Sequence, residues 1–175
     1  MKKSGGDPHG SHEGSNILTQ LSSVSIFLWL FFIISYIFFN NVLEHLWLLN
    51  FLSNDMLIIS GVVSIFIGFL FEILGIIALG INFRIELPTE ETELITSGVY
   101  RIMRNPIVFG IFLLVIGTFF IIPTLIGLFI CMFNILNFNS KAIDEEKFLL
   151  RRFGKEYENY RNKVGRYLPF KIGTK

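Results

Sequence analysis

Three long apolar stretches constrain the fold of this chain more than any other feature of its sequence. Residues 21–39 form a run of 19 residues without a charge, and residues 56–81 contain a single charged side chain, Glu72. Residues 107–139 also lack charge, although Pro123 interrupts them. Because about 20 apolar residues cross the hydrocarbon core of a bilayer, the chain is predicted to be an integral membrane protein.

The third apolar stretch is too long for one straight membrane helix. A helix of its 33 residues would extend roughly 50 Å, well beyond the hydrocarbon core. Proline is poorly tolerated inside a helix but suits a helix start, so Pro123 is predicted to begin a new helix after a tight turn. The expected fold is all-α, with about four transmembrane helices that include a hairpin of residues 106–122 and 124–139.

The positions of the basic residues predict how these helices are oriented. All 15 Lys and Arg residues fall within residues 2–3, 84–104 and 141–175, which four membrane crossings place on one side. Loops rich in Lys and Arg remain in the cytoplasm, so both termini and the loop after the second helix are predicted to be cytoplasmic. The net charge of +1 gives no sign of nucleic-acid binding, and the surrounding lipids are the expected partners of the apolar helices.

The second apolar stretch carries two features of interest. Gly61, Gly68, Gly75 and Gly80 are spaced by seven, seven and five residues, and small residues at such intervals let another helix approach closely. Glu72 is costly at membrane depth and is expected to face a partner or a cavity. A protonated or snorkelling carboxylate near the helix end is an equal alternative.

Two polar segments carry the residue types that a site would need. Residues 97–106 are predicted to form a loop at the membrane surface, with a turn at Gly98 and Pro106 at the first position of the next helix. A basic loop that only fixes topology is the alternative. Residues 140–175 are predicted to form an amphipathic cytoplasmic helical segment, kinked or divided at Gly154. Its apolar stripe consists of Leu149, Phe153, Tyr157, Tyr160 and Val164.

Several polar residues have simpler structural interpretations. Arg101 and Arg104 are expected to anchor the loop to lipid phosphates, and Asp144 and Glu146 to cap the start of a helix. Residues 1–16 are predicted to be a disordered tail. His9 and His12 lie within this tail, so no metal site is predicted.

The motifs in the two polar segments resemble a known family. The loop reads LITSGVYR (residues 94–101) and then RNP (residues 104–106), while the C-terminal region reads DEE (residues 144–146), FGKEY (residues 153–157) and LP (residues 168–169). Together they are similar to the isoprenylcysteine carboxyl methyltransferases, which are grouped with the phospholipid N-methyltransferases. The resemblance covers about residues 61–170. It implies a single membrane methyltransferase domain, residues 17–175, that uses S-adenosylmethionine.

The resemblance also implies which residues form the site. The implied cofactor contacts are Glu93, Leu94, Ile95, Tyr100, Asn105, Pro106, Ile107, Val108 and Glu145. Lys141 falls where a basic residue contacts the methyl-accepting substrate. This chain departs from the family pattern at four positions: Asn105 replaces a common His, Val108 a common Tyr, Lys141 an Arg, and Glu72 a frequent Arg.

The chemistry of these residues is compatible with methyl transfer to a lipidic or prenylated acceptor. A carboxylate is ionised near neutral pH, so no catalytic acid or base is needed beyond residues that position the reactants. Lys141 and Glu145 are four residues apart and share one face of a helix, although such a pair also forms ordinary salt bridges. Two other functions stay open: a phospholipid N-methyltransferase, and a non-enzymatic scaffold or transporter subunit that uses Glu72.

Overall fold

The structure, a computed structural model, describes residues 8–43, 54–80 and 94–169. Five α-helices and one short 3₁₀ helix make up these residues: α1 (Pro8–Leu43), α2 (Asp55–Leu79), η3 (Gly98–Arg101), α3 (Pro106–Ile121), α4 (Leu125–Phe153) and α5 (Lys155–Lys163). Helix α1 begins inside the segment predicted to be a disordered tail, so residues 8–16 are helical where the sequence predicted none.

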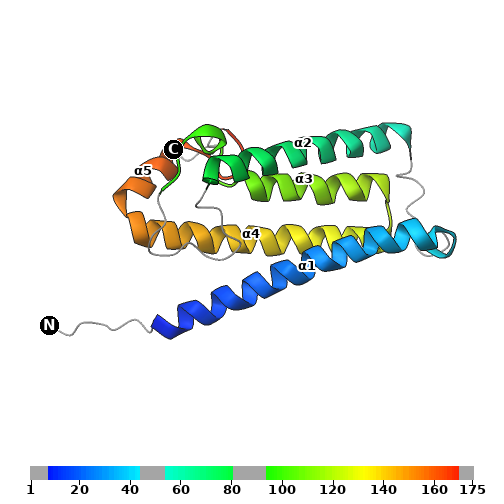
Figure 1. Cartoon of the computed structure of the whole chain (residues 1–175), viewed down its shortest axis with the longest axis horizontal. Coiled ribbons are helices and arrows are strands. Elements are labelled where there is room, and N and C mark those ends of the chain that lie inside the picture. The colour runs from blue at the N-terminus through cyan, green and yellow to red at the C-terminus, as the bar shows by residue number, and fades with distance from the viewer. Residues whose placement is uncertain (1–7, 44–53, 81–93, 170–175) are drawn as a thin grey trace.

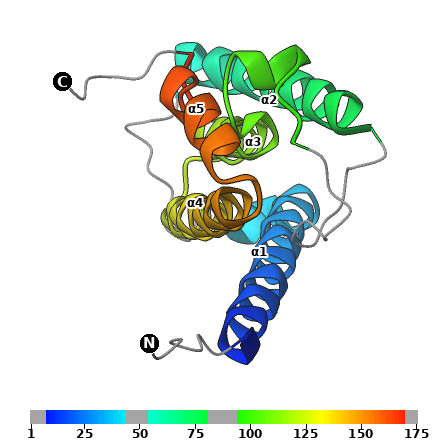
Figure 2. The ribbon, with the colours of Figure 1, turned by 90° about the vertical axis from the view of Figure 1, so that its left-hand side faces the viewer.

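Helices α2, α3 and α4 run side by side along the long axis of the molecule, and α1 lies obliquely against α4 (Figure 1). Figure 2 shows α2 next to α3 and α1 next to α4, with α5 across the end of the bundle. Within the part of the chain that the structure describes, three segments are long and apolar enough to cross a membrane: Gln20–Phe39, Asp55–Leu79 and Leu125–Phe153. Helix α3, the fourth predicted crossing, has 16 residues and is about 24 Å long. The prediction of an all-helical membrane protein is confirmed.

Helices α2 and α3 approach each other closely along their glycines. A Cβ atom built on Gly61 would lie 2.7 Å from the carbonyl oxygen of Gly117, and one on Gly68 would lie 2.8 Å from that of Gly110. The predicted role of Gly61, Gly68 and Gly75 as a close-packing stripe is therefore confirmed. Gly80 differs, because it ends α2 with a φ of 52° and a Cβ atom built on it would meet no atom within 4 Å.

The hairpin is formed as the sequence predicted, but its second helix is longer. Ile122, Pro123 and Thr124 separate α3 from α4, and the Thr124 hydroxyl accepts a hydrogen bond from the Gly127 amide at 2.9 Å. The predicted end at residue 139 is wrong, because α4 continues to Phe153. The residues after Asn139 include Lys, Ala, Glu and Leu, all of which favour helix. The sequence therefore becomes polar at this point while the backbone stays helical.

Gly154 ends α4 and separates it from α5, as the sequence predicted. Its φ is 51°, a left-handed value that residues with a Cβ rarely adopt. The amphipathic stripe of the C-terminal region is consequently divided between two helices. Tyr157 of α5 is buried, whereas Leu149 and Phe153 at the end of α4 are half-buried.

Candidate functional site

Residues 94–105, which precede α3, bring polar residues to one end of the bundle. The Gly98 backbone has a φ of 60° and begins η3, which buries Val99 and Tyr100. Pro106 occupies the first turn of α3, where a missing backbone N–H costs little, and it is almost fully buried. Asn105 therefore lies at the N-cap of α3 and is buried itself.

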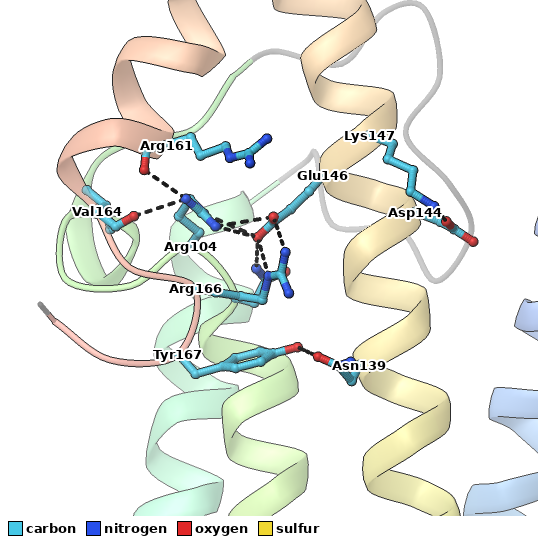
Figure 3. A network of polar contacts seen from close by, with 10 residues as sticks. Arg104, Asn139, Asp144, Glu146, Lys147, Arg161, Val164, Arg166 and Tyr167 are labelled. Carbon is cyan, nitrogen blue, oxygen red and sulfur yellow. Dashed lines mark hydrogen bonds and ion pairs between the residues drawn. The ribbon is translucent and has the colours of Figure 1, made fainter. Parts of the chain in front are cut away.

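The Glu146 carboxylate of α4 is the centre of a buried polar cluster, which we call the Glu146 cluster (Figure 3). Arg104 donates to it through Nε and Nη2, each at 3.2 Å. Arg166 donates through Nε at 3.0 Å and Nη2 at 2.8 Å, and Asn105 through Nδ2 at 2.9 Å. The Glu146 and Arg104 side chains are only 6% and 8% exposed. Charge-assisted bonds of this kind are stronger than neutral ones.

Residues 164–169, which follow α5, form a strap across the start of α3. The Arg104 amide donates to the Gly165 carbonyl at 2.9 Å, and the Asn105 amide donates to the Arg166 carbonyl at 3.0 Å. Tyr167 packs edge-on against Phe112 of α3, while its hydroxyl donates to Asn139 of α4 at 3.0 Å. The strap therefore connects the two helices of the hairpin through both backbone and side-chain contacts.

Three tyrosines lie between η3, α4 and α5. The Tyr160 hydroxyl donates to the Tyr100 carbonyl at 2.6 Å, and Tyr157 packs edge-on against Tyr160. Burial raises the pKa of the Tyr100 hydroxyl well above its usual value, and the nearby negative charge of Glu145 raises it further. Burial likewise raises the pKa of Tyr157 and Tyr160. All three phenols are therefore neutral hydrogen-bond donors at physiological pH.

Lys141 and Glu145 lie on α4 and interact electrostatically, as their spacing predicted. Both residues are half-buried. Glu145 is also close enough to Tyr100 for its charge to affect that hydroxyl. Because consecutive helical residues point about 100° apart, Glu145 faces a different direction from Glu146, whose carboxylate is held in the cluster.

The structure describes all but one of the residues implied to contact the cofactor. Glu93 lies outside the described residues. Leu94 and Ile95 precede η3 and are half-buried, and Ile107 packs against Gly75 of α2. Val108 is half-buried in the first turn of α3. The implied contacts thus come from three elements that meet at one end of the bundle, together with Glu145 of α4.

Two interpretations of charged residues are wrong. Arg104 was expected to reach lipid phosphates, but its guanidinium is buried against Glu146 and also donates to the carbonyls of Arg161 and Val164. Asp144 and Glu146 were expected to cap a helix start, but α4 begins at Leu125, about five turns earlier. Arg101, by contrast, is exposed.

Arg166 and Tyr167 also belong to this region, although the sequence did not predict it. Their partners lie 20 and 28 residues away in the chain, so no local spacing points to the contacts. The only available signal was the position of Arg166 and Tyr167 directly before the LP motif.

Comparison with known proteins supports the resemblance. Residues 56–156 match a family described as phospholipid methyltransferase. A rice protein (Oryza sativa subsp. japonica), named "Probable protein-S-isoprenylcysteine O-methyltransferase", is 36% identical over 114 residues, which are 63% of this chain and 60% of the relative. Protein-S-isoprenylcysteine O-methyltransferase B of Arabidopsis thaliana is 30% identical over 143 residues, 79% of this chain and 68% of the relative.

A shorter match has a higher identity. Protein-S-isoprenylcysteine O-methyltransferase of Saccharomyces cerevisiae is 40% identical over 78 residues, 44% of this chain and 33% of the relative. The chain thus spans about three fifths of the rice protein and one third of the yeast protein. The family match covers more than half of the chain, and the Arabidopsis match covers more than two thirds of that relative. The chain therefore belongs to the isoprenylcysteine carboxyl methyltransferase family, within the wider group of phospholipid methyltransferases.

Proposed function

We propose that this protein is a membrane methyltransferase that uses S-adenosylmethionine and methylates the carboxylate of a prenylated cysteine or a similar lipidic acceptor. One observation carries the proposal: Tyr100, Asn105 and Glu145 come from three separate elements, yet they lie at one end of the bundle in a chain of this family. The described Lys and Arg residues fall within residues 101–104 and 141–166. The elements that hold most of them, η3, the C-terminal part of α4 and α5, meet at this end of the bundle (Figure 1), which supports a site that opens to the cytoplasm.

The polar groups in this region fit the cofactor. S-adenosylmethionine carries amino and hydroxyl donors, and it supplies a methyl group on a sulfonium, which a nucleophile can attack directly while the neutral thioether leaves. Glu145 and the carbonyl oxygen of Asn105 are acceptors for such donors. The neutral Tyr100 ring and the apolar side chains of Ile107 and Val108 offer surfaces for the adenosine. These five residues are the chain's own contribution to the proposed recognition of the cofactor.

Lys141 is the proposed partner of the acceptor carboxylate. A carboxylate loses hydration when it enters a half-buried pocket, and a nearby ammonium offsets that cost. Lys141 lies one turn before Glu145, so one face of α4 presents an acceptor partner beside a cofactor partner. Since the carboxylate is already ionised, the residues need only align the reactants, which contributes about 7–11 kcal/mol in favourable cases.

A phospholipid N-methyltransferase is the second candidate, favoured by the description of the matched family. A cation beside the accepting amine is unhelpful, so Lys141 argues against it. Glu72 argues the other way, because it is a half-buried carboxylate next to Gly110 of α3. Such a carboxylate would attract an amine headgroup and could take the proton that the amine must lose before it accepts a methyl group. The choice between carboxylate and amine acceptors therefore depends on which side chain faces the substrate.

Methylation assays with labelled S-adenosylmethionine test both candidates. The acceptor is either a farnesylcysteine analogue or phosphatidylethanolamine, and the variants are Lys141→Gln and Lys141→Arg. For a carboxylate acceptor we expect Lys141→Gln to lower kcat/KM and Lys141→Arg to retain it, because a guanidinium binds a carboxylate through two parallel bonds. Lys147→Gln is the matched control, since Lys147 forms an exposed ion pair with Asp144 at 2.7 Å.

The outcomes separate the candidates. Methylation of the lipid amine alone, with Lys141→Gln as active as the wild type, would leave the phospholipid N-methyltransferase in place of the carboxylate enzyme. Absence of methyl transfer, combined with no thermal stabilisation by S-adenosylhomocysteine, would reject a methyltransferase and favour the scaffold or transporter subunit.

A further inference from the structure

The Glu146 cluster fixes the orientation of the Asn105 side chain. An ionised carboxylate only accepts hydrogen bonds, and Asn105 lies 2.9 Å from Glu146 Oε1. The amide nitrogen must therefore point at Glu146, and the amide oxygen must point away from it. The nitrogen and oxygen of a side-chain amide are often hard to tell apart. Here the carboxylate can only accept a hydrogen bond, so the atom that faces it must be the nitrogen.

Glu146 itself is fully occupied. Its Oε1 accepts from Arg104 Nε, Asn105 Nδ2 and Arg166 Nε, and its Oε2 accepts from the Nη2 atoms of the two arginines. Five donors exceed the roughly four lone-pair positions of a carboxylate. Since the side chain is also only 6% exposed, Glu146 acts on other residues of the chain and not on a ligand.

Arg166 is the member of the cluster that belongs to the strap. Its side chain is 33% exposed, whereas that of Arg104 is 8% exposed. Arg166 therefore lies on the solvent side of the Glu146 carboxylate, and Arg104 lies on the buried side. The hydrogen bonds that Arg166 donates to Glu146 are the largest cause of the raised pKa of its guanidinium. Without Arg166, water would reach the Glu146 carboxylate. Water would then compete with the Asn105 amide nitrogen for the carboxylate oxygen, and the amide would no longer be held in one orientation.

We propose that Arg166 and Glu146 are positioning residues that hold the Asn105 amide oxygen towards the cofactor. The inference rests on the proposed function and extends it to a residue of the strap. A lone carbonyl oxygen accepts from an N–H or O–H group and repels an anion. Asn105 thus recognises an amino or hydroxyl group of the cofactor, not its carboxylate, and cofactor affinity depends on a docked strap.

Calorimetric titration with S-adenosylhomocysteine, well below the melting temperature of each variant, tests the proposal. We expect Arg166→Met to raise Kd about tenfold, equivalent to about 1.4 kcal/mol, and Arg166→Lys to raise it less because the charge remains. Lys147→Met is the matched control, since it removes a cation from an exposed ion pair on the far side of α4 (Figure 3). Its Kd should equal that of the wild type.

A double-mutant cycle shows whether Arg166 acts through Asn105. If it does, Arg166→Met combined with Asn105→Ala binds no more weakly than Asn105→Ala alone. A purely structural role of Arg166 gives additive losses instead, and that result overturns the proposal. If Arg166→Met does not fold, the cycle is repeated with Arg166→Lys, for which we expect about a threefold increase in Kd. Losses that are not additive with Asn105→Ala again support the proposal, and additive losses again overturn it.

The experiment also distinguishes this inference from the proposed function. A wild-type protein that fails to bind S-adenosylhomocysteine overturns both. A wild-type protein that binds it, with an unchanged Kd in folded Arg166→Met, leaves the methyltransferase proposal intact and overturns the positioning role.

Discussion

Replacing Gly117 of α3 by valine tests the close packing of α2 against α3 away from the candidate site. A Cβ atom there would lie 2.6 Å from the Gly61 carbonyl oxygen, 2.8 Å from Ile65 Cγ1 and 3.1 Å from the Ile65 amide nitrogen. Two of these three atoms are backbone, so no rotamer change relieves the contact, and the helices must separate. Separation by 0.5–1 Å already forfeits about a quarter to a half of each dispersion contact.

The expected loss of stability follows from this geometry. Overpacking costs about 1–3 kcal/mol, and valine brings two further methyl groups beyond Cβ, so we expect the upper part of that range. For a chain of this length this lowers Tm by roughly 5–10 °C, measurable by thermal denaturation in detergent. The control is Leu70→Val, which introduces the same residue at a position of α2 that is 46% exposed. An unchanged Tm for Gly117→Val would refute close helix contact at this position.

Three further predictions concern the end of the bundle that holds the site. Glu145→Ala should weaken S-adenosylhomocysteine binding by about 1.5–3 kcal/mol, the range for a hydrogen bond to a charged group; unchanged calorimetric affinity would remove Glu145 from the cofactor site. Glu146→Leu should destabilise the fold by about 3–5 kcal/mol because it leaves Arg104 buried without its anion, and a Tm equal to that of the wild type would contradict this. Gly154→Ala should cost about 1–2 kcal/mol because Gly154 has a left-handed φ of 51°; equal Tm values would show that the α4–α5 junction adapts.

The parts of the fold that the sequence predicts are those set by local physics. Apolar length predicts membrane crossings, Pro123 predicts the break in the hairpin, and Gly154 predicts the junction before α5. The spacing of Gly61, Gly68 and Gly75 predicts a close helix contact, although it does not identify Gly110 and Gly117 of α3 as the opposing surface. A pattern along one helix describes that helix alone, and its partner depends on the packing of the whole bundle.

The candidate site was predicted only in part, for the same reason. The loop motif and the paired acids led to Tyr100, Asn105 and Glu145, but Arg166 entered the site only through the fold. Its partner Glu146 is 20 residues away, and Arg104 is 42 residues from that same carboxylate. A helix start at residue 140 would have made Glu146 a capping residue. The continuous α4 places it instead on a face covered by the strap.

The two adjacent acids of α4 show why paired residues need not share a role. A step of one residue turns the side chain by about 100°, which directs Glu146 into the strap and Glu145 towards Tyr100 and Lys141. Two arginines and an amide neutralise and occupy Glu146, whereas Glu145 is half-buried and accepts no hydrogen bond from the described residues. An acid that is saturated by its own chain can organise a site, and only an acid with free acceptor capacity can bind a ligand in it. The difference in hydrogen bonding between Glu146 and Glu145 therefore follows from the helical turn and from the strap that covers one of them.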